Sequence, residues 1–202
     1  MDPAIESYRL LDIMPASGRM LTKIHSQPQQ PTVIESPFPK PWSKPRLILV
    51  NFDLWSRLSQ NQRDLLMLRT VCWQLQIKWF TFDLYPGLVG AGVLGTLFEL
   101  VQVDAVGIVI AGSLTGFAAA QIWRSHRSSQ SELLADETAI GIAQRRGYTE
   151  TEAAQYLLEA IQIVAKVEGR PGLSFTELIR CQNLRAIAGL SAFGVPKGEI
   201  RE

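Results

Sequence analysis

The chain has 202 residues and a formal net charge of +1 at pH 7. That length suits one domain, and a charge near zero excludes the large basic surface that nucleic-acid binding needs. Cys72 and Cys181 lack CxxC spacing, so they predict neither a disulfide framework nor a zinc ribbon and suit a reducing compartment. Residues 1–11 contain charged side chains and no uninterrupted apolar run, which excludes a secretory signal there.

Residues 1–46 are predicted to form an N-terminal region of their own. Residues 3–14 suit a short helix that ends at Pro15. Residues 27–46 are rich in proline, which excludes a helix interior or a central strand and predicts an extended segment that lies on a surface or is largely mobile. The prolines of this segment are Pro28, Pro31, Pro37, Pro39, Pro41 and Pro45.

Residues 47–202 are predicted to form a second, single domain that opens with a strand and a helix. Residues 47–52 are a short apolar strand candidate. Ser59 and Gln62 form a capping box, which predicts a helix from about Gln60 to the end of the seventies.

Two apolar runs follow this helix. Residues 84–98 and 105–123 contain no charged side chain, and with its flanks each run approaches the roughly 20 residues that span a bilayer. Acidic Glu99 and Asp104 lie in the connection, and basic residues flank both outer ends. By the positive-inside rule, this pattern predicts a transmembrane hairpin at about 80–123 with both termini cytoplasmic.

Small residues inside both runs favour the membrane hairpin. A glycine in a water-exposed helix costs roughly 1 kcal/mol relative to alanine, whereas in a bilayer small residues four positions apart let helices pack closely. The alternative is a helical hairpin buried inside a soluble domain. The predicted packing residues are Gly87, Ala91, Gly95, Gly112 and Gly116.

Three helices are predicted after the hairpin, from two further capping boxes and from glycines that suit helix ends. The predicted elements are a helix from Ser129 to Gly147, a helix opened by Thr149 and Glu152 and ending near Val167, a turn at 169–172, and a helix opened by Ser174 and Glu177 and ending near Gly189.

Glu132 and Asp136 stand at i and i+4 in the sequence Glu-Leu-Leu-Ala-Asp and therefore share one helix face. A helix, an apolar hairpin, this ExxAD helix and then Gly147-Tyr148 occur in the same order in HtpX-like and CAAX-prenyl-protease-like membrane zinc metalloproteases, which the chain resembles from about residue 47 to residue 190. The resemblance implies that Glu132 is the third zinc ligand and that Asp136 hydrogen-bonds a ligand histidine.

The resemblance also implies an HExxH sequence before the hairpin, with two histidine ligands and a glutamate as general base. A gapless alignment places Arg69, Thr70 and Trp73 at those three positions. The two histidines of the chain, His25 and His126, lack partners to replace the missing ligands. We therefore predict a degenerate site without metal or another cofactor. Its residues are Arg69, Thr70, Trp73, Glu132 and Asp136.

In the absence of a metal, another cation is expected beside the two carboxylates. The planar guanidinium of Arg69 suits a carboxylate partner. We predict an Arg69–Glu132 ion pair, with Asp136 as the alternative acceptor and Trp73 filling the space of the second histidine. The alternative is that Arg69 points to water and Glu132 pairs within its own helix. Arg63, on the same helix as Arg69, is expected to be exposed.

Several longer stretches resemble a family of cyanobacterial membrane proteins that is described as a domain of unknown function. The matching stretches are LLDIMPASGRM, FDLWSRL, ADETAI with the following IAQRRGY, and FTELIRCQNLRAIAGL. This resemblance implies a photosynthetic prokaryote and a plasma or thylakoid membrane, but no activity.

The sequence thus predicts a mainly α-helical integral membrane fold. One transmembrane hairpin lies inside a metalloprotease-like helical scaffold that has a short N-terminal β segment. The expected function is that of a non-catalytic pseudo-metalloprotease which binds membrane-protein clients or partners in assembly or quality control. The alternatives are a structural subunit of a larger membrane complex and a hydrolase with an unrecognised site. The expected partners are the lipid bilayer and a membrane protein, and not nucleic acid.

Overall fold

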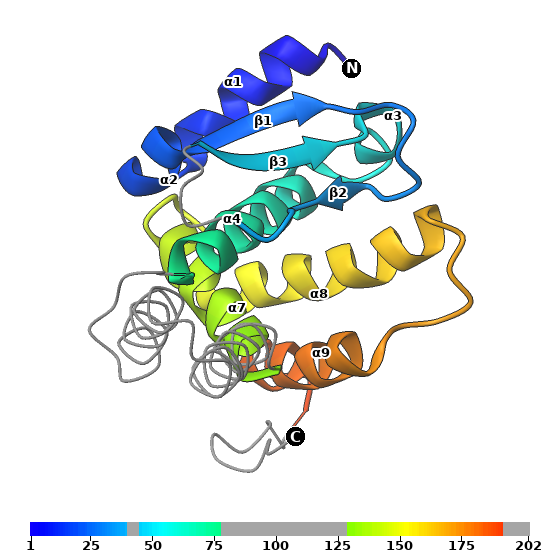
Figure 1. The fold of residues 1–202 in the computed structure, drawn as a ribbon. Coiled ribbons are helices and arrows are strands. Elements are labelled where there is room, and N and C mark those ends of the chain that lie inside the picture. Colours follow the sequence, from blue (N-terminus) through cyan, green and yellow to red (C-terminus); the bar gives the residue numbers. More distant parts are fainter. Residues whose placement is uncertain (40–44, 78–128, 192–202) are drawn as a thin grey trace, which may run out of the picture. The chain divides into compact units, whose positions relative to one another are not determined.

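A computed structural model describes residues 1–39, 45–77 and 129–191. The chain divides into two compact units, residues 1–76 with 129–202 and residues 77–128. Figure 1 shows its elements. They are α1 (Pro3–Ile13), α2 (Ala16–Leu21), β1 (Thr22–Ser26), β2 (Ile34–Glu35), β3 (Arg46–Val50), α3 (Phe52–Trp55), α4 (Gln60–Gln76), α7 (Ser129–Gln144), α8 (Glu150–Val167) and α9 (Phe175–Ile187).

The three strands form one sheet in the order β1-β3-β2. β1 runs parallel to β3, with Thr22 opposite Arg46 and Ser26 opposite Val50. β2 runs antiparallel to β3, with Ile34 opposite Val50. The strand predicted at residues 47–52 is present as the central strand β3, but it ends at Val50, and Asn51 and Phe52 instead begin the next helix, α3. The strands on either side of β3 come from residues upstream in the chain.

The proline-rich segment between β1 and β3 is anchored more firmly than its composition predicted. Val33 is fully buried, and its N–H donates to Glu168 Oε1 at 2.8 Å. The side-chain amide of Asn51 donates to the carbonyls of Pro28 and Gln30, both at 2.9 Å. These bonds satisfy backbone groups that would otherwise need water. The prediction of a surface or mobile segment is therefore wrong at Gln30 and Val33, both of which are buried.

The predicted helix starts are confirmed. Each of the three capping boxes has its reciprocal pair of hydrogen bonds, and α4, α8 and α9 begin directly after their capping residues. α7 ends at Gln144, shortly before Gly147, and Gly189 follows α9. Gly147 has a φ of 98° and Gly189 a φ of 70°, a backbone conformation that favours glycine and ends helices.

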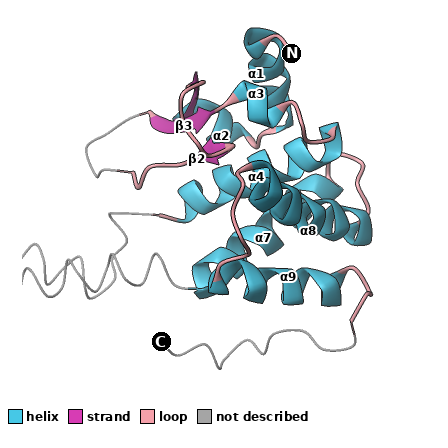
Figure 2. Cartoon of the chain, turned by 90° about the vertical axis from the view of Figure 1, so that its right-hand side faces the viewer, coloured by secondary structure: helices cyan, strands magenta, loops and turns pink. Residues whose placement is uncertain are grey.

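α4 has apolar contacts on two sides, so that it lies between the two apolar clusters of the described residues. The candidate site is built beside this helix. The sheet and α1 lie on one side of α4, and α7 and α9 lie on the other (Figure 1; Figure 2 shows the same layers after a quarter turn). Leu65 and Leu68 pack with α7, α8 and α9, whereas Leu66 and Val71 pack with α1 and the sheet. Gln74 is fully buried and donates to a backbone carbonyl of β3 at 2.8 Å, which holds the end of α4 against the sheet.

The prediction of an integral membrane fold is corrected by the helices that the structure describes. Within residues 1–39, 45–77 and 129–191, no helix is long and apolar enough to cross a bilayer. The longest of them, α8, has 18 residues and contains charged side chains along its length, whereas a span needs about 20 mainly apolar residues. The predictions of a transmembrane fold and of a plasma or thylakoid membrane location are therefore not retained.

The hairpin predicted at about 80–123 lies outside the described residues, as does His126. The same applies to the residues predicted to pack its helices, which are Gly87, Ala91, Gly95, Gly112 and Gly116.

The start of α9 is held by an ion pair between Arg170 and Glu177. Arg170 Nη1 and Nη2 each lie 2.8 Å from one oxygen of Glu177. Burial opposes ionisation of this carboxyl, but hydrogen bonds from Arg170 and Ser174 outweigh burial and lower the pKa of Glu177 to about 2. Because this pKa lies below the unfolded value, Glu177 stabilises the fold near neutral pH, and this contribution is lost as the pH falls through the acid range.

We expect Glu177→Gln to lower the free energy of unfolding at pH 7. The variant should then lose less stability than the wild type between about pH 5 and pH 3, because the titrating group is gone. Urea unfolding at a series of pH values measures both effects. Glu150→Gln, at an exposed position on α8, is the control and should follow the wild type. The same pH dependence in Glu177→Gln and the wild type would contradict this assignment.

Candidate functional site

Four charged side chains from three helices meet beside α4. Arg69 comes from α4, Glu132 and Asp136 from α7, and Arg180 from α9. Arg69 Nη2 contacts Glu132 Oε2, and Arg69 Nε lies 3.4 Å from Asp136 Oδ1. The predicted Arg69–Glu132 ion pair is therefore confirmed, and Asp136, which was predicted as the alternative partner, lies within ion-pair distance at the same time. We call these four residues the charge cluster.

Arg180 is the member of the charge cluster that the sequence did not identify. Its Nε and Nη2 each lie 2.8 Å from one oxygen of Asp136, which forms a bidentate ion pair. The side chain of Asp136 is 0% exposed and that of Arg180 is 8% exposed. The sequence did contain one indication that Arg180 is buried. Arg180 stands four residues before the core residue Leu184, and this spacing puts both side chains on one helix face.

The charge cluster balances two positive charges against two carboxylates. Burial, followed by the nearby charge of Arg180, lowers the pKa of Arg69 to about 9 against the opposing effect of Asp136, so the guanidinium is charged at neutral pH. Burial also acts to lower the pKa of Arg180, but Asp136 outweighs burial and the pKa is raised. Arg180 therefore depends on the carboxylate of Asp136, and Arg69 on those of Asp136 and Glu132 together, because a buried charge without a partner is strongly destabilising.

Thr70 and Trp73, the other two residues predicted for the degenerate site, have partners outside the charge cluster. The Thr70 hydroxyl donates to the Leu66 carbonyl of its own helix at 2.8 Å. The ring of Trp73 packs edge-on against Phe38, with ring centroids 6.2 Å apart. Of the five predicted residues, Arg69, Glu132 and Asp136 thus contact one another in the structure. Thr70 and Trp73 contact other residues instead.

Both cysteines are buried and free. Burial is the largest influence on Cys72 and raises the pKa of its thiol to about 12. The charge of Arg69 acts to lower this pKa, and that of Asp136 acts to raise it. Burial also raises the pKa of the Cys181 thiol. A thiol that stays protonated at neutral pH is a poor nucleophile and a poor metal ligand. Within residues 1–39, 45–77 and 129–191, no group of three His, Cys, Asp or Glu side chains could hold a metal ion.

A second charged network holds α1 against the first half of α4. Arg9 Nη1 lies 2.6 Å from Asp64 Oδ1, and Arg9 Nε lies 2.8 Å from Glu6 Oε2. The Tyr148 hydroxyl donates to Asp64 Oδ2 at 3.0 Å. Arg63 pairs with Glu6 at 3.1 Å, and its side chain is only 13% exposed. The expectation that Arg63 is exposed is therefore wrong, because α1 packs against α4.

Comparison with known proteins places the chain in a family. A family model described as "Protein of unknown function (DUF3318)" matches residues 8–148, a range that includes Arg69, Glu132 and Asp136 and ends before Arg180. No curated protein and no solved structure matches the chain. These results confirm the expected domain of unknown function and do not address a cyanobacterial source or a relation to metalloproteases. Because the match covers well over half of the sequence, the chain belongs to the family described as "Protein of unknown function (DUF3318)".

Proposed function

We propose that this protein is a non-catalytic, protein-binding relative of the HtpX-like and CAAX-prenyl-protease-like zinc metalloproteases. The observation that carries the proposal is the contact of Arg69 with Glu132 and Asp136. In the alignment with those enzymes, Arg69 stands at the first zinc-ligand position and Glu132 at the third. A guanidinium thus meets the carboxylate that such an enzyme would use to bind zinc.

The residues at the three HExxH positions do not fit a zinc ion. A catalytic zinc needs three protein ligands and leaves a further position for water. The guanidinium of Arg69 and the indole of Trp73 are donors without a lone pair for a metal. Thr70 donates its hydroxyl to Leu66 and lacks a carboxylate that could act as general base. These positions therefore offer neither the two missing ligands nor the base.

The charge cluster also supports a scaffold that persists without a metal. A buried carboxylate is costly unless a positive charge compensates it, and Arg69 and Arg180 supply two such charges. With this compensation, the helices α4, α7 and α9 can stay packed together without a metal and without a catalytic role. We infer that this group of helices binds a protein partner or client, in assembly or quality control.

Zinc content tests the proposed loss of catalysis. Elemental analysis of the wild-type protein should find far less than one zinc per chain, and zinc should not stimulate peptide hydrolysis. The triple variant R69H/T70E/W73H restores HExxH and should bind about one zinc per chain, with Glu132 as third ligand. Adding Glu132→Gln to the triple variant is the matched control and should weaken zinc binding.

Two outcomes would contradict this part of the proposal. Stoichiometric zinc in the wild type that is lost on Glu132→Gln would show that a metal site is intact. A triple variant that folds but binds no zinc would argue against the relation to metalloproteases.

Affinity capture with the cross-linked wild-type protein tests the proposed binding role, with an unloaded matrix as control. Several substoichiometric client proteins would support that role. A single stoichiometric partner would instead identify a fixed subunit of a complex, and recovery of nothing beyond the control would contradict a binding function.

A further inference from the structure

Within residues 1–39, 45–77 and 129–191, no strand pairs with the outer side of β1. Among the strands that the structure describes, β1 is an outer strand with β3 on one side only. In a parallel ladder, successive residues alternate between those whose N–H and C=O face the neighbouring strand and those whose groups face away. The N–H of Gln27 donates to the Val50 carbonyl at 2.9 Å and so faces β3. By alternation, Ile24 and Ser26 turn their N–H and C=O away from β3.

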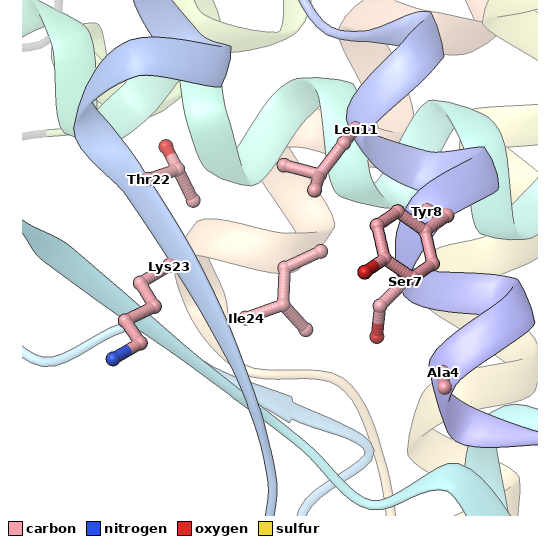
Figure 3. Close-up of a pocket in the computed structure, with 7 residues that line it drawn as sticks. All are labelled: Ala4, Ser7, Tyr8, Leu11, Thr22, Lys23 and Ile24. Carbon is pink, nitrogen blue, oxygen red and sulfur yellow. The ribbon is translucent and has the colours of Figure 1, made fainter.

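α1 lies beside this outer side and leaves an apolar pocket of about 310 Å³. Figure 3 shows Leu11 and Tyr8 on α1 facing Thr22 and Ile24 on β1 across the pocket. Tyr8 is 75% exposed although its ring lines the pocket. An unpaired strand beside such a pocket is the arrangement that binds extended peptides by strand addition, in which backbone bonds provide affinity and the pocket provides specificity.

The charges on β1 indicate which peptide would fit. Side chains alternate along a strand, so Lys23 and His25 share the face opposite to Ile24, and both are exposed. Lys23 also borders the pocket. An acidic side chain directly across from Lys23 would stabilise an added strand by about 0.2–1 kcal/mol, and a like charge would destabilise it. The imidazole of His25 can donate a hydrogen bond to a second acidic side chain. The positive charge of the exposed Lys23 on this outer strand also disfavours self-association through the edge.

We propose that the β1 edge and the α1–β1 pocket bind an extended segment of another protein in which apolar and acidic side chains alternate. An apolar side chain of the segment packs against Leu11 and Ile24. Its acidic neighbours lie on the other face, beside Lys23 and His25. The backbone of the segment pairs with Ile24. The inference does not rest on the proposed loss of metal chemistry, because none of these residues belongs to the charge cluster.

Binding of labelled hexapeptides, followed by fluorescence anisotropy at low salt, tests the proposal. The peptide Thr-Glu-Val-Glu-Val-Thr should bind saturably. Two control peptides, with lysine in place of glutamate or proline in place of valine, should bind about ten-fold more weakly, because they reverse the charge or remove backbone donors. Lys23→Glu should reverse the preference between the acidic and the basic peptide. Lys166→Glu, the same change at an exposed position on α8, should leave it unchanged.

Amide hydrogen exchange locates the bound peptide. The amides of Ile24 and Ser26 should become protected in the complex, while those of Lys23 and His25, which face β3, should change little. Ala4→Trp, a replacement at an exposed pocket-lining position on the first turns of α1, should fill the pocket and weaken binding without loss of the fold.

Four results would overturn the proposal. The first two are equal binding of the acidic and basic peptides and absence of binding to the wild type. The third is a dimer that is lost on Ala4→Trp, which would identify a second copy as the occupant. The fourth is binding that appears only after removal of residues 192–202, which would identify the C-terminal segment of the chain itself.

Discussion

Asp136→Ala is expected to destabilise this protein more than any other single change in the charge cluster. The substitution leaves Arg69 and Arg180 largely buried without the carboxylate that they share. Removing one partner of a buried ion pair costs about 3–5 kcal/mol, because an uncompensated charge remains inside the protein. Since a typical domain is stable by only about 5–15 kcal/mol, the variant should lose a large part of its stability.

Urea unfolding followed by tryptophan fluorescence measures this loss. Asp12→Ala is the matched control on α1, because the Asp12 side chain is 86% exposed, and it should change stability by less than about 0.5 kcal/mol. The double variant D136L/R180M removes both charges of the bidentate pair and should be more stable than Asp136→Ala. A loss for Asp136→Ala no greater than that of Asp12→Ala would show that the buried pair does not hold the helices together.

Arg69→Ala is expected to produce the second large effect, a loss of about 1–3 kcal/mol. The loss should be smaller than for Asp136→Ala, because each of the two carboxylates that remain still has a group that solvates or pairs with it. Glu132 is 18% exposed and can reach water, and Asp136 keeps its two bonds to Arg180. The prediction compares the free energy of unfolding of Arg69→Ala with that of an exposed arginine variant.

Arg63 cannot serve as that control, because it is itself paired with Glu6. Arg185, an exposed residue on α9, is suitable, and Arg185→Ala should leave stability nearly unchanged. A double-mutant cycle with Glu132→Ala isolates the Arg69–Glu132 interaction from other effects of the truncation. A coupling energy indistinguishable from zero would mean that the ion pair does not stabilise the fold.

The helix boundaries were predictable because their signals are local. A capping box joins residues three positions apart, so Thr149 with Glu152 and Ser174 with Glu177 mark helix starts whatever surrounds them. Gly147 lies just past a helix for a similar reason, since its positive φ depends on its own backbone. The carboxylate pair of α7 was also visible, because i and i+4 residues share a helix face.

Part of the charge cluster was predictable only through a resemblance between motifs. The alignment with metalloproteases led to the pairing of Arg69 with Glu132, which composition and periodicity do not indicate. The motifs of that alignment gave no role to Arg180, which pairs with Asp136 from a helix more than forty positions away. The alignment also left Arg63 as an exposed residue, because it is the packing of α1 that covers this part of α4.

The sequence by itself determined where most helices begin and end, and it identified the central strand. Only the tertiary structure decided how these elements are covered and paired. Hydropathy measures how apolar a segment is and not what packs against it, so it predicted a membrane fold that the charged helices of the described unit do not support. The parallel pairing of β1 with β3, the burial of Val33 and the two arginines beside Asp136 all join residues far apart in the chain. Such contacts depend on the packing of whole elements, which no local pattern encodes.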